Sequence, residues 1–325
     1  MSLTKSSFSA LGRRDPTRTT GLRNAFARAM NKRFTKLTRD IQRVVVLEDG
    51  FGLLAAEEAR VFKEKLGLGE FAAQQAFDFP TSQAKIEAFR EWLQEMIDAD
   101  ILEVTERYQA GQPLEEAWTD IYIRQAYEQG VRRGRAELIW AGYTVPPIES
   151  GGLAPMFFGP FHADRVGILY ARTFAELKGI TSAMDSQISR VLAQGIAEGE
   201  NPLQLARLLT RTITGPSGDL GITDTLGRYI PARRRANMLA RTEIIRAHHM
   251  ATIQEYRNWE VEDVYVKAEW VTAEDNRVCP ICKALEGQVF TLDVAEKMIP
   301  RHPQCRCCTI PVDITDKIRR ERARR

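Results

Sequence analysis

The chain has 325 residues, of which 44% are hydrophobic and 27% charged, a balance typical of a globular protein long enough for two domains. No apolar run approaches the ~20 residues that span a bilayer, and the first residues lack the apolar core of a secretory signal, so we expect neither a membrane protein nor a secreted one. The net charge of +3 is unevenly spread, because residues 1–45 hold eleven Lys or Arg against two Asp, whereas residues 48–140 hold ten basic and nineteen acidic residues.

This segregation predicts two different surfaces, one of them suited to an anionic partner. Residues 1–18 are polar and basic, and we predict a disordered arm that orders only against a partner. A helix is predicted from Leu22 to Val44, where apolar residues recur at steps of three and four. Its other faces are basic, and the candidate nucleic-acid contacts on them are Arg23, Arg28, Lys32, Arg33 and Lys36. A solvated helix face that packs on the rest of the protein is the alternative.

The acidic part of the chain is also predicted to be helical. A short helix is expected within residues 50–69, Thr81 and Ser82 cap a helix that runs to Ile101, and another helix runs from Leu114 to about Ala141. Because like charge repels phosphate, we expect this acidic region to dock on protein rather than on DNA.

Residues 143–160 contain four prolines and three glycines and form the clearest boundary in the chain. We therefore predict a helical N-terminal domain at residues 19–142, a linker at 143–160, a second domain at 161–312 and a basic tail at 313–325. A long surface loop inside one domain is the alternative to a linker.

Helical patterns resume after the linker, at about residues 163–177 and 182–197, and again after Asn201 and Pro202, a pair typical of an N-cap and a first turn. A long helix is predicted from about residue 231 to 259. Three basic residues at its start oppose the helix macrodipole, so an anionic partner is the alternative to the solvated surface that we expect there. They are Arg233, Arg234 and Arg235.

All five cysteines lie near the C-terminal end. Cys279 and Cys282 form a C-x-x-C pair, and His302 and Cys305 follow as H-x-x-C, so two short-range pairs are separated by a loop, as in tetrahedral zinc sites. We predict a structural zinc ion, and Cys308 is expected to point away from it. The predicted ligands are Cys279, Cys282, His302 and Cys305, with Cys307 as the substitute for the fourth. Disulfides, or cysteines that pack as small hydrophobes, are the alternatives.

Alternating apolar residues at 264–270 predict a strand with one buried face, and a second strand is expected at 288–292. A sheet this small buries too little apolar surface to be stable alone, and a structural zinc ion contributes about 10–16 kcal/mol to the folding of small metal domains. The predicted fold class is therefore mainly α (α+β), with a helical N-terminal region and a C-terminal helical module that ends in a small zinc-clamped antiparallel sheet.

The cysteine-rich stretch reads D-x-R-V-C-x-x-C, a hairpin that contains Gly, P-x-H-P-x-C-R-C, and a closing Pro. The residues that carry this pattern are Asp275, Arg277, Val278, Cys279, Cys282, Gly287, Pro300, His302, Pro303, Cys305, Arg306, Cys307 and Pro311. They resemble the signature of phage head morphogenesis proteins, the Mu F-like minor head (minor capsid) protein family. The sequence A-R-T-E at residues 240–243 resembles the helix before that hairpin, and the resemblance covers roughly residues 160–312. The doubled Cys307-Cys308 departs from the pattern.

The resemblance implies a structural, non-enzymatic minor head protein in the virion of a tailed phage. It implies attachment to the phage portal protein during procapsid assembly, a part in DNA packaging or delivery, and contact with packaged double-stranded DNA or other capsid proteins. It places the protein in the capsid interior near the portal vertex, and in the host cytoplasm during assembly. No catalytic residue, small-molecule substrate or membrane is implied.

Two other functions remain open. The first is a metal-dependent nuclease of the ββα-metal kind, acting on phage or host DNA, for which His302 is the candidate base, although its place inside the metal clamp suits a ligand better. The second is a zinc-ribbon DNA-binding regulator, which is disfavoured because no recognition helix stands out. No H-E-x-x-H motif and no glycine-rich phosphate loop occurs in the sequence.

Overall fold

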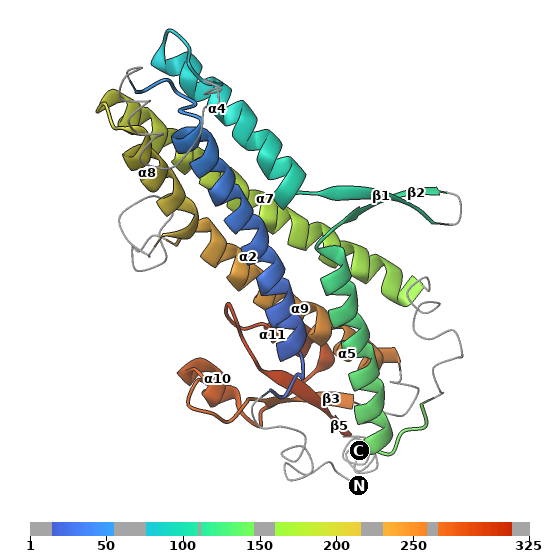
Figure 1. Cartoon of the computed structure of the whole chain (residues 1–325). Coiled ribbons are helices and arrows are strands. Elements are labelled where there is room, and N and C mark those ends of the chain that lie inside the picture. Colours follow the sequence, from blue (N-terminus) through green and yellow to red (C-terminus); the bar gives the residue numbers. More distant parts are fainter. Residues whose placement is uncertain are drawn as a thin grey trace. The chain divides into compact units, whose positions relative to one another are not determined.

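The structure is a computed structural model that describes residues 15–54, 76–109, 112–145, 160–215, 230–258 and 266–313. The helices are α2 (Thr20–Gln42), α4 (Ser82–Met96), α5 (Asp120–Trp140), α7 (Pro160–Ala197), α8 (Pro202–Thr214), α9 (Ala232–Asn258), α10 (Pro280–Leu285) and α11 (Leu292–Met298), with π-helical segments η1 (Arg43–Leu47) and η2 (Ile97–Ile101) (Figure 1). The strands are β1 (Val104–Gln109), β2 (Gln112–Ala117), β3 (Val266–Val271), β4 (Val289–Phe290) and β5 (Cys308–Asp313). The protein is mainly α with a small antiparallel sheet near the C-terminus, as predicted. Among the described helices, none has the length and apolar character needed to cross a membrane.

The chain forms two compact units, each assembled from segments far apart in the sequence. Unit 1 comprises Met1–Ala27, Trp118–Thr173 and Met238–Arg325, and unit 2 comprises Arg28–Ala117 and Phe174–Asn237. Most of the predicted linker at 143–160 lies outside the described residues, as do nearly all of the predicted arm and tail. The division into sequential domains at 19–142 and 161–312 therefore stays a prediction.

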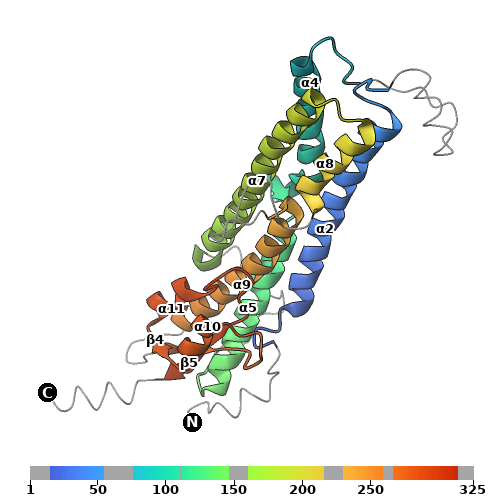
Figure 2. The ribbon, with the colours of Figure 1, turned by 90° about the vertical axis from the view of Figure 1, so that its left-hand side faces the viewer.

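Unit 2 is built on a helical bundle (Figure 2). The apolar stripe of α2 is fully buried at Phe34, Leu37 and Ile41, which confirms the helix predicted from its three- and four-residue spacing. The start of α4 is also as predicted, since the Thr81 hydroxyl accepts the N–H of Ala84. In the same way, the Asn201 side chain caps α8 by accepting the N–H of Gln204.

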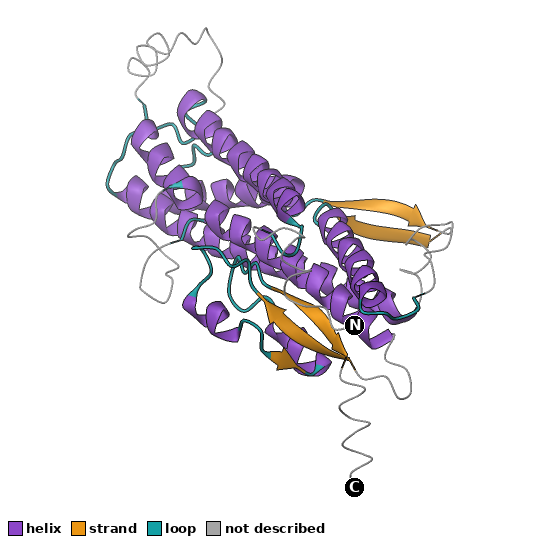
Figure 3. Ribbon diagram, turned by 90° about the horizontal axis from the view of Figure 1, so that it is seen from below, coloured by secondary structure: helices purple, strands orange, loops and turns teal. Residues whose placement is uncertain are grey.

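The helix predicted from Leu114 is wrong at its start. Residues 112–117 form β2 instead, which pairs with β1 in an antiparallel hairpin whose register puts Val104 opposite Ala117, and α5 begins only at Asp120 (Figure 3). Pro113 disfavours a helix interior but is tolerated in β2, because both strands of a two-stranded hairpin are edge strands.

The two helices predicted at 163–177 and 182–197 are one helix, α7, of 38 residues. Gly179 lies inside it without a break, and no atom lies near the position that a Cβ would take there. A solvent-facing glycine costs a helix only about 1 kcal/mol, so tertiary packing overrides its propensity.

Unit 1 is centred on the close packing of α5 against α9. A Cβ at Gly130 would meet the backbone oxygen of His248 at 2.2 Å, and one at Gly134 would meet the Cβ of Glu255 at 2.8 Å. Only glycine permits this approach of the two helices. It brings α9 under the C-terminal sheet, where Tyr256 and Ile253 share a buried cluster with Val266 of β3.

The sheet of unit 1 has the strand order β4-β3-β5, all antiparallel. The predicted strands correspond to β3, which buries alternate residues at Val266, Ala268 and Trp270, and to the short β4. The third strand, β5, and the short helices α10 and α11 were not predicted. The cysteine-rich stretch thus contains two short helices and an edge strand, and residues 299–307 between α11 and β5 form a loop.

Candidate metal centre

The first cysteine pair is placed by the start of α10. Cys279 has extended backbone angles and occupies the N-cap position, and its sulfur accepts the N–H of Cys282 at 3.4 Å. Pro280 fits the first helical turn because that position needs no N–H donor. The sequence Cys-Pro-x-Cys therefore folds into a single capped turn that holds both sulfurs on the same side.

His302 faces this turn from the opposite loop. Its Nε2 atom lies 3.3 Å from the sulfur of Cys279 and 3.3 Å from that of Cys282. Its Nδ1 atom lies 2.9 Å from the carbonyl oxygen of Pro303, which can only accept, so we assign the ring proton to Nδ1. The Nε2 lone pair is then directed at the two sulfurs, as in a metal-binding histidine whose other nitrogen is held by the backbone.

The remaining thiols complete the cluster. The sulfurs of Cys282, Cys305 and Cys307 lie within 4.8 Å of one another, as do the ligand atoms of Cys279, Cys282 and His302. Metal–ligand distances of about 2.0–2.3 Å place neighbouring ligand atoms of a tetrahedron roughly 3.3–3.8 Å apart. The spacing of these side chains therefore suits a tetrahedral ion, with Cys282 common to both groups.

The thiols also influence one another electrostatically. The pKa of Cys305 is lowered to about 5, chiefly by a hydrogen bond from the Cys307 thiol. Burial raises the pKa of Cys282 to about 12, with the negative charge at Cys305 as the next cause, and the hydrogen bond to Cys305 raises that of Cys307. One thiolate forms readily, while the next is disfavoured unless a cation balances the charge. This chemistry matches a divalent metal site.

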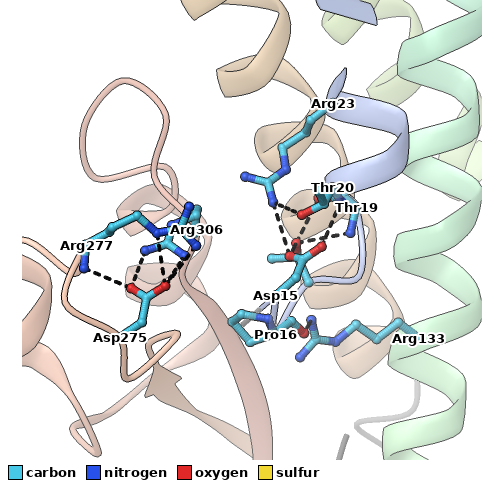
Figure 4. A network of polar contacts seen from close by, with 10 residues as sticks. Asp15, Pro16, Thr19, Thr20, Arg23, Arg133, Asp275, Arg277 and Arg306 are labelled. Carbon is cyan, nitrogen blue, oxygen red and sulfur yellow. Dashed lines mark hydrogen bonds and ion pairs between the residues drawn. The ribbon is translucent and has the colours of Figure 1, made fainter. Parts of the chain in front are cut away.

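Polar contacts brace the loops that carry the ligands. Arg306, which separates two cysteines, forms a bidentate pair with Asp275 at 2.6 and 2.8 Å, and Arg277 binds the same carboxylate (Figure 4). The Arg306 guanidinium holds the pKa of Asp275 well below its usual range. From α9, the Thr242 hydroxyl accepts the N–H of Gln304 at 3.0 Å, which fixes the turn between His302 and Cys305. The Asp, Arg and Thr of the sequence pattern therefore support the ligands rather than bind a metal.

Cys308 belongs to a different network, one that the sequence did not reveal. Its sulfur lies 3.0 Å from Nη2 of Arg133 on α5, and neither group of candidate ligands includes it. Arg133 also pairs with Glu137 at 2.7 Å and donates to the carbonyl oxygen of Pro16. Glu137 accepts from Tyr256, and both of these side chains are buried. The sequence gives one sign of this network. Arg133 and Glu137 have opposite charges and are four residues apart, so they share a face of α5, close to Gly130 and Gly134.

The predicted nucleic-acid contacts differ in how exposed their side chains are and in whether they pair with acidic residues. Arg23 is only 7% exposed, and its guanidinium binds Asp15 and Thr20. In unit 2, Arg33 pairs with Glu103 at 2.7 Å, and Lys36 pairs with Asp100 at 2.5 Å. Arg28 and Lys32 are exposed, and neither side chain has a partner among the described residues.

The start of α9 lies beside α2 within unit 2. Asn237 donates to Asn31 at 2.7 Å, and the two helices border a hollow of about 600 Å³ whose lining includes Arg233 and Arg234. Arg235, the third residue of the predicted basic cluster, is half-buried. The exposed cations Arg28 and Lys32 therefore belong to the same unit as the hollow.

The model of the family described as phage Mu protein F like protein matches residues 186–310. This segment ends inside β5 and includes α8, α9 and the whole metal centre. The match confirms the resemblance found in the cysteine-rich motif, over a shorter range than the 160–312 inferred from it, and it points to a role in phage head morphogenesis. No curated protein and no solved structure matches the chain.

Proposed function

We propose that this protein is a structural minor head protein of a tailed phage that attaches to the portal and acts in procapsid assembly and in DNA packaging or delivery. The observation that carries this proposal is the family match at residues 186–310, because it spans both the metal centre and the helix that braces it. The portal and the DNA are the finer parts of the proposal, and separate observations support each of them.

In this proposal the metal centre holds a structural zinc ion. Cys279, Cys282 and His302, with Cys305 or Cys307, supply enough nitrogen and sulfur ligands to close a tetrahedral sphere. Bound zinc would contribute folding free energy to the small sheet. Water has little access to these sulfurs, because Cys282 is 1% exposed and Cys305 is 0% exposed.

The same geometry argues against the nuclease alternative, since both ring nitrogens of His302 are already engaged. We expect the full-length protein to leave double-stranded phage DNA intact in the presence of added Mg²⁺, Mn²⁺ or Zn²⁺. We expect His302→Ala to lose zinc and to melt at a lower temperature. If the wild type cuts DNA and His302→Ala abolishes cutting with zinc content and melting temperature unchanged, the protein is an enzyme instead.

We place the contact with DNA on the basic surface of unit 2, formed by Arg28, Lys32, Arg233 and Arg234. These cations come from two helices joined by the Asn31–Asn237 hydrogen bond, and Arg233 and Arg234 line the hollow at the start of α9. The helix N-terminus adds a partial positive charge. Arg23 is left out of this surface because it is buried against Asp15.

Replacing all four cations with glutamine is expected to weaken binding to double-stranded DNA regardless of sequence, because the contact rests on neutralising phosphates. The slope of log K against log salt should become shallower by up to about 4, one counterion for each cation removed. The measurement is a fluorescence titration at several salt concentrations. A matched variant replaces Arg190, Lys283, Lys297 and Arg301, which are also exposed. Equal loss in both variants would show that net charge, and not this surface, binds DNA.

We place the contact with the portal on α4, whose outer face is acidic. Glu87, Glu91 and Glu95 are exposed at four-residue spacing, and they lie opposite the buried Phe89 and Leu93. A rigid helix that presents three carboxylates repels DNA and suits a basic protein surface. This assigns the predicted docking role of the acidic N-terminal region to one element.

A further inference from the structure

A cavity of about 300 Å³ opens along one face of α5, within unit 1. We call it the α5 groove. Its walls come from Gln129, Arg132, Ala136 and Trp140 of α5, from His248 of α9, and from residues 16–18. The α5 residues recur at steps of three and four, so they form a continuous stripe that is roughly 16 Å long at 1.5 Å per residue.

The lining of the groove includes a buried imidazole with no hydrogen-bond partner among the described residues. His248 is 3% exposed and lines the cavity, yet neither of its ring nitrogens hydrogen-bonds to another described residue. Its neighbour His249 is equally buried, but its Nε2 lies 2.8 Å from the carbonyl oxygen of Ala295. A ligand in the groove can therefore hydrogen-bond to this imidazole, whose ring nitrogens no described residue uses.

The charges around the groove favour an anion. Arg18, Arg132 and Arg133 line it, against one acidic residue, Glu137, which already pairs with Arg133. Burial, together with the positive charge of Arg133, holds the pKa of His248 well below its usual range, so the ring is neutral and offers one donor and one acceptor. Arg132 is exposed and its side chain has no partner in the described parts of the chain.

The wall opposite α5 is held in place before any ligand binds. Asp15 caps α2 by accepting the N–H of Thr20 at 2.7 Å and the Thr17 hydroxyl at 2.7 Å, and it pairs with Arg23 (Figure 4). Arg133 donates to the carbonyl oxygen of Pro16 at 2.5 Å, which ties this segment to α5. A rigid groove loses less entropy on binding than a flexible one.

We propose that the α5 groove binds an extended acidic peptide of a partner protein. One carboxylate of the peptide pairs with Arg132, an apolar side chain lies on Trp140 and Ala136, and a peptide group hydrogen-bonds to His248. The half-exposed Trp140 supplies the large apolar contact that such sites need. The inference does not depend on the head role, because it rests on the groove alone.

A nucleic acid fits the groove less well. A single strand carries one phosphate per ~3.4 Å, so about five phosphates would lie along the stripe, opposite few cations and close to Glu137. An acidic peptide can separate its carboxylates by apolar residues. Such a peptide matches the stripe, in which Arg132 is followed by Ala136 and Trp140.

The test uses the full-length protein and a fluorescein-labelled peptide, GELDFEG, blocked at both ends, with fluorescence anisotropy as the readout. The comparison probes are GKLKFKG and a ten-nucleotide oligothymidine. We expect saturable binding of the acidic peptide and none of the basic one. Arg132→Glu should raise the Kd at least about 10-fold, because it reverses a charge in direct contact with the peptide.

Trp140→Ala should also weaken binding, with its melting temperature unchanged because that side chain is half exposed. Arg190→Glu, an exposed site on α7, is the matched control and should leave the Kd unchanged. The proposal is overturned if the acidic peptide shows no saturable binding up to about 1 mM, the weak end of specific affinity. It is also overturned if Arg132→Glu and Arg190→Glu act alike, or if only oligothymidine binds and Arg132→Glu abolishes that binding.

Discussion

Cys282→Ser is expected to empty the metal centre and unfold the module formed by β3, α10, β4, α11 and β5. Cys282 belongs to both groups of candidate ligands, so its replacement removes a ligand from each. Its side chain is 1% exposed, so water has little access to the vacated position. Structural zinc contributes about 10–16 kcal/mol in small metal domains, a large quantity beside the 5–15 kcal/mol that stabilises a whole domain. The measurements are zinc content by elemental analysis and proteolytic susceptibility of residues 266–313. Chelation of zinc in the wild type should reproduce the effect.

Cys308→Ser provides the matched control. Cys308 is as buried as Cys307, but its sulfur contacts Arg133 instead of the cluster. This variant should keep about one zinc per chain and should lose only the weak contact with Arg133. A wild type without zinc, or a Cys282→Ser protein that retains both zinc and the fold, would contradict the assignment of a structural metal.

Glu137→Ala is expected to destabilise unit 1 by about 3–5 kcal/mol, because it leaves Arg133, whose side chain is only 13% exposed, without its carboxylate. Glu137 is 2% exposed and also accepts from Tyr256, so the substitution removes two buried hydrogen bonds. Burial raises the pKa of Glu137, and Arg133 is the main group that opposes this rise. The readout is the midpoint of urea unfolding. Glu128→Ala, on the same helix but without a side-chain partner among the described residues, should change the midpoint little.

A second substitution separates the two causes of this loss. If the unpaired Arg133 charge is responsible, Arg133→Met combined with Glu137→Leu should recover most of the stability, since apolar residues of similar size often replace buried ion pairs at little cost. A double variant as unstable as Glu137→Ala would show that shape or the Tyr256 hydrogen bond matters more than charge. The contacts of Arg133 with Cys308 and Thr309 make this pair a polar link between α5 and β5.

The helices were predictable where periodicity and capping agree. The apolar stripe of α2 and the caps at Thr81 and Asn201 are local signals, and the structure follows them. Prediction failed where a local signal competes with tertiary packing. Two helices were predicted at 163–177 and 182–197, but α7 continues from one to the other, and the helix predicted from Leu114 is replaced by β2 over residues 112–117.

The candidate metal centre was predictable in its members but not in its surroundings. Short ligand spacings within the chain indicate which side chains converge, and the structure brings these cysteines and His302 together. The support from Thr242 and the Arg133–Cys308 contact could not be predicted, because the latter joins residues 175 positions apart. The groove was hidden for the same reason, since His248 meets α5 only after folding.

The most direct test of the proposed head role is co-purification of the full-length protein with its cognate portal, followed by quantitative analysis of purified procapsids. We expect the wild type to be retained by the portal and to be present in procapsids at low copy. The charge-reversed variant Glu87→Lys, Glu91→Lys, Glu95→Lys should lose the portal, whereas lysines at the exposed Asp164, Glu198 and Glu274 should not. A protein that is absent from procapsids, is not retained by the portal and cuts DNA with added divalent metal would contradict the account.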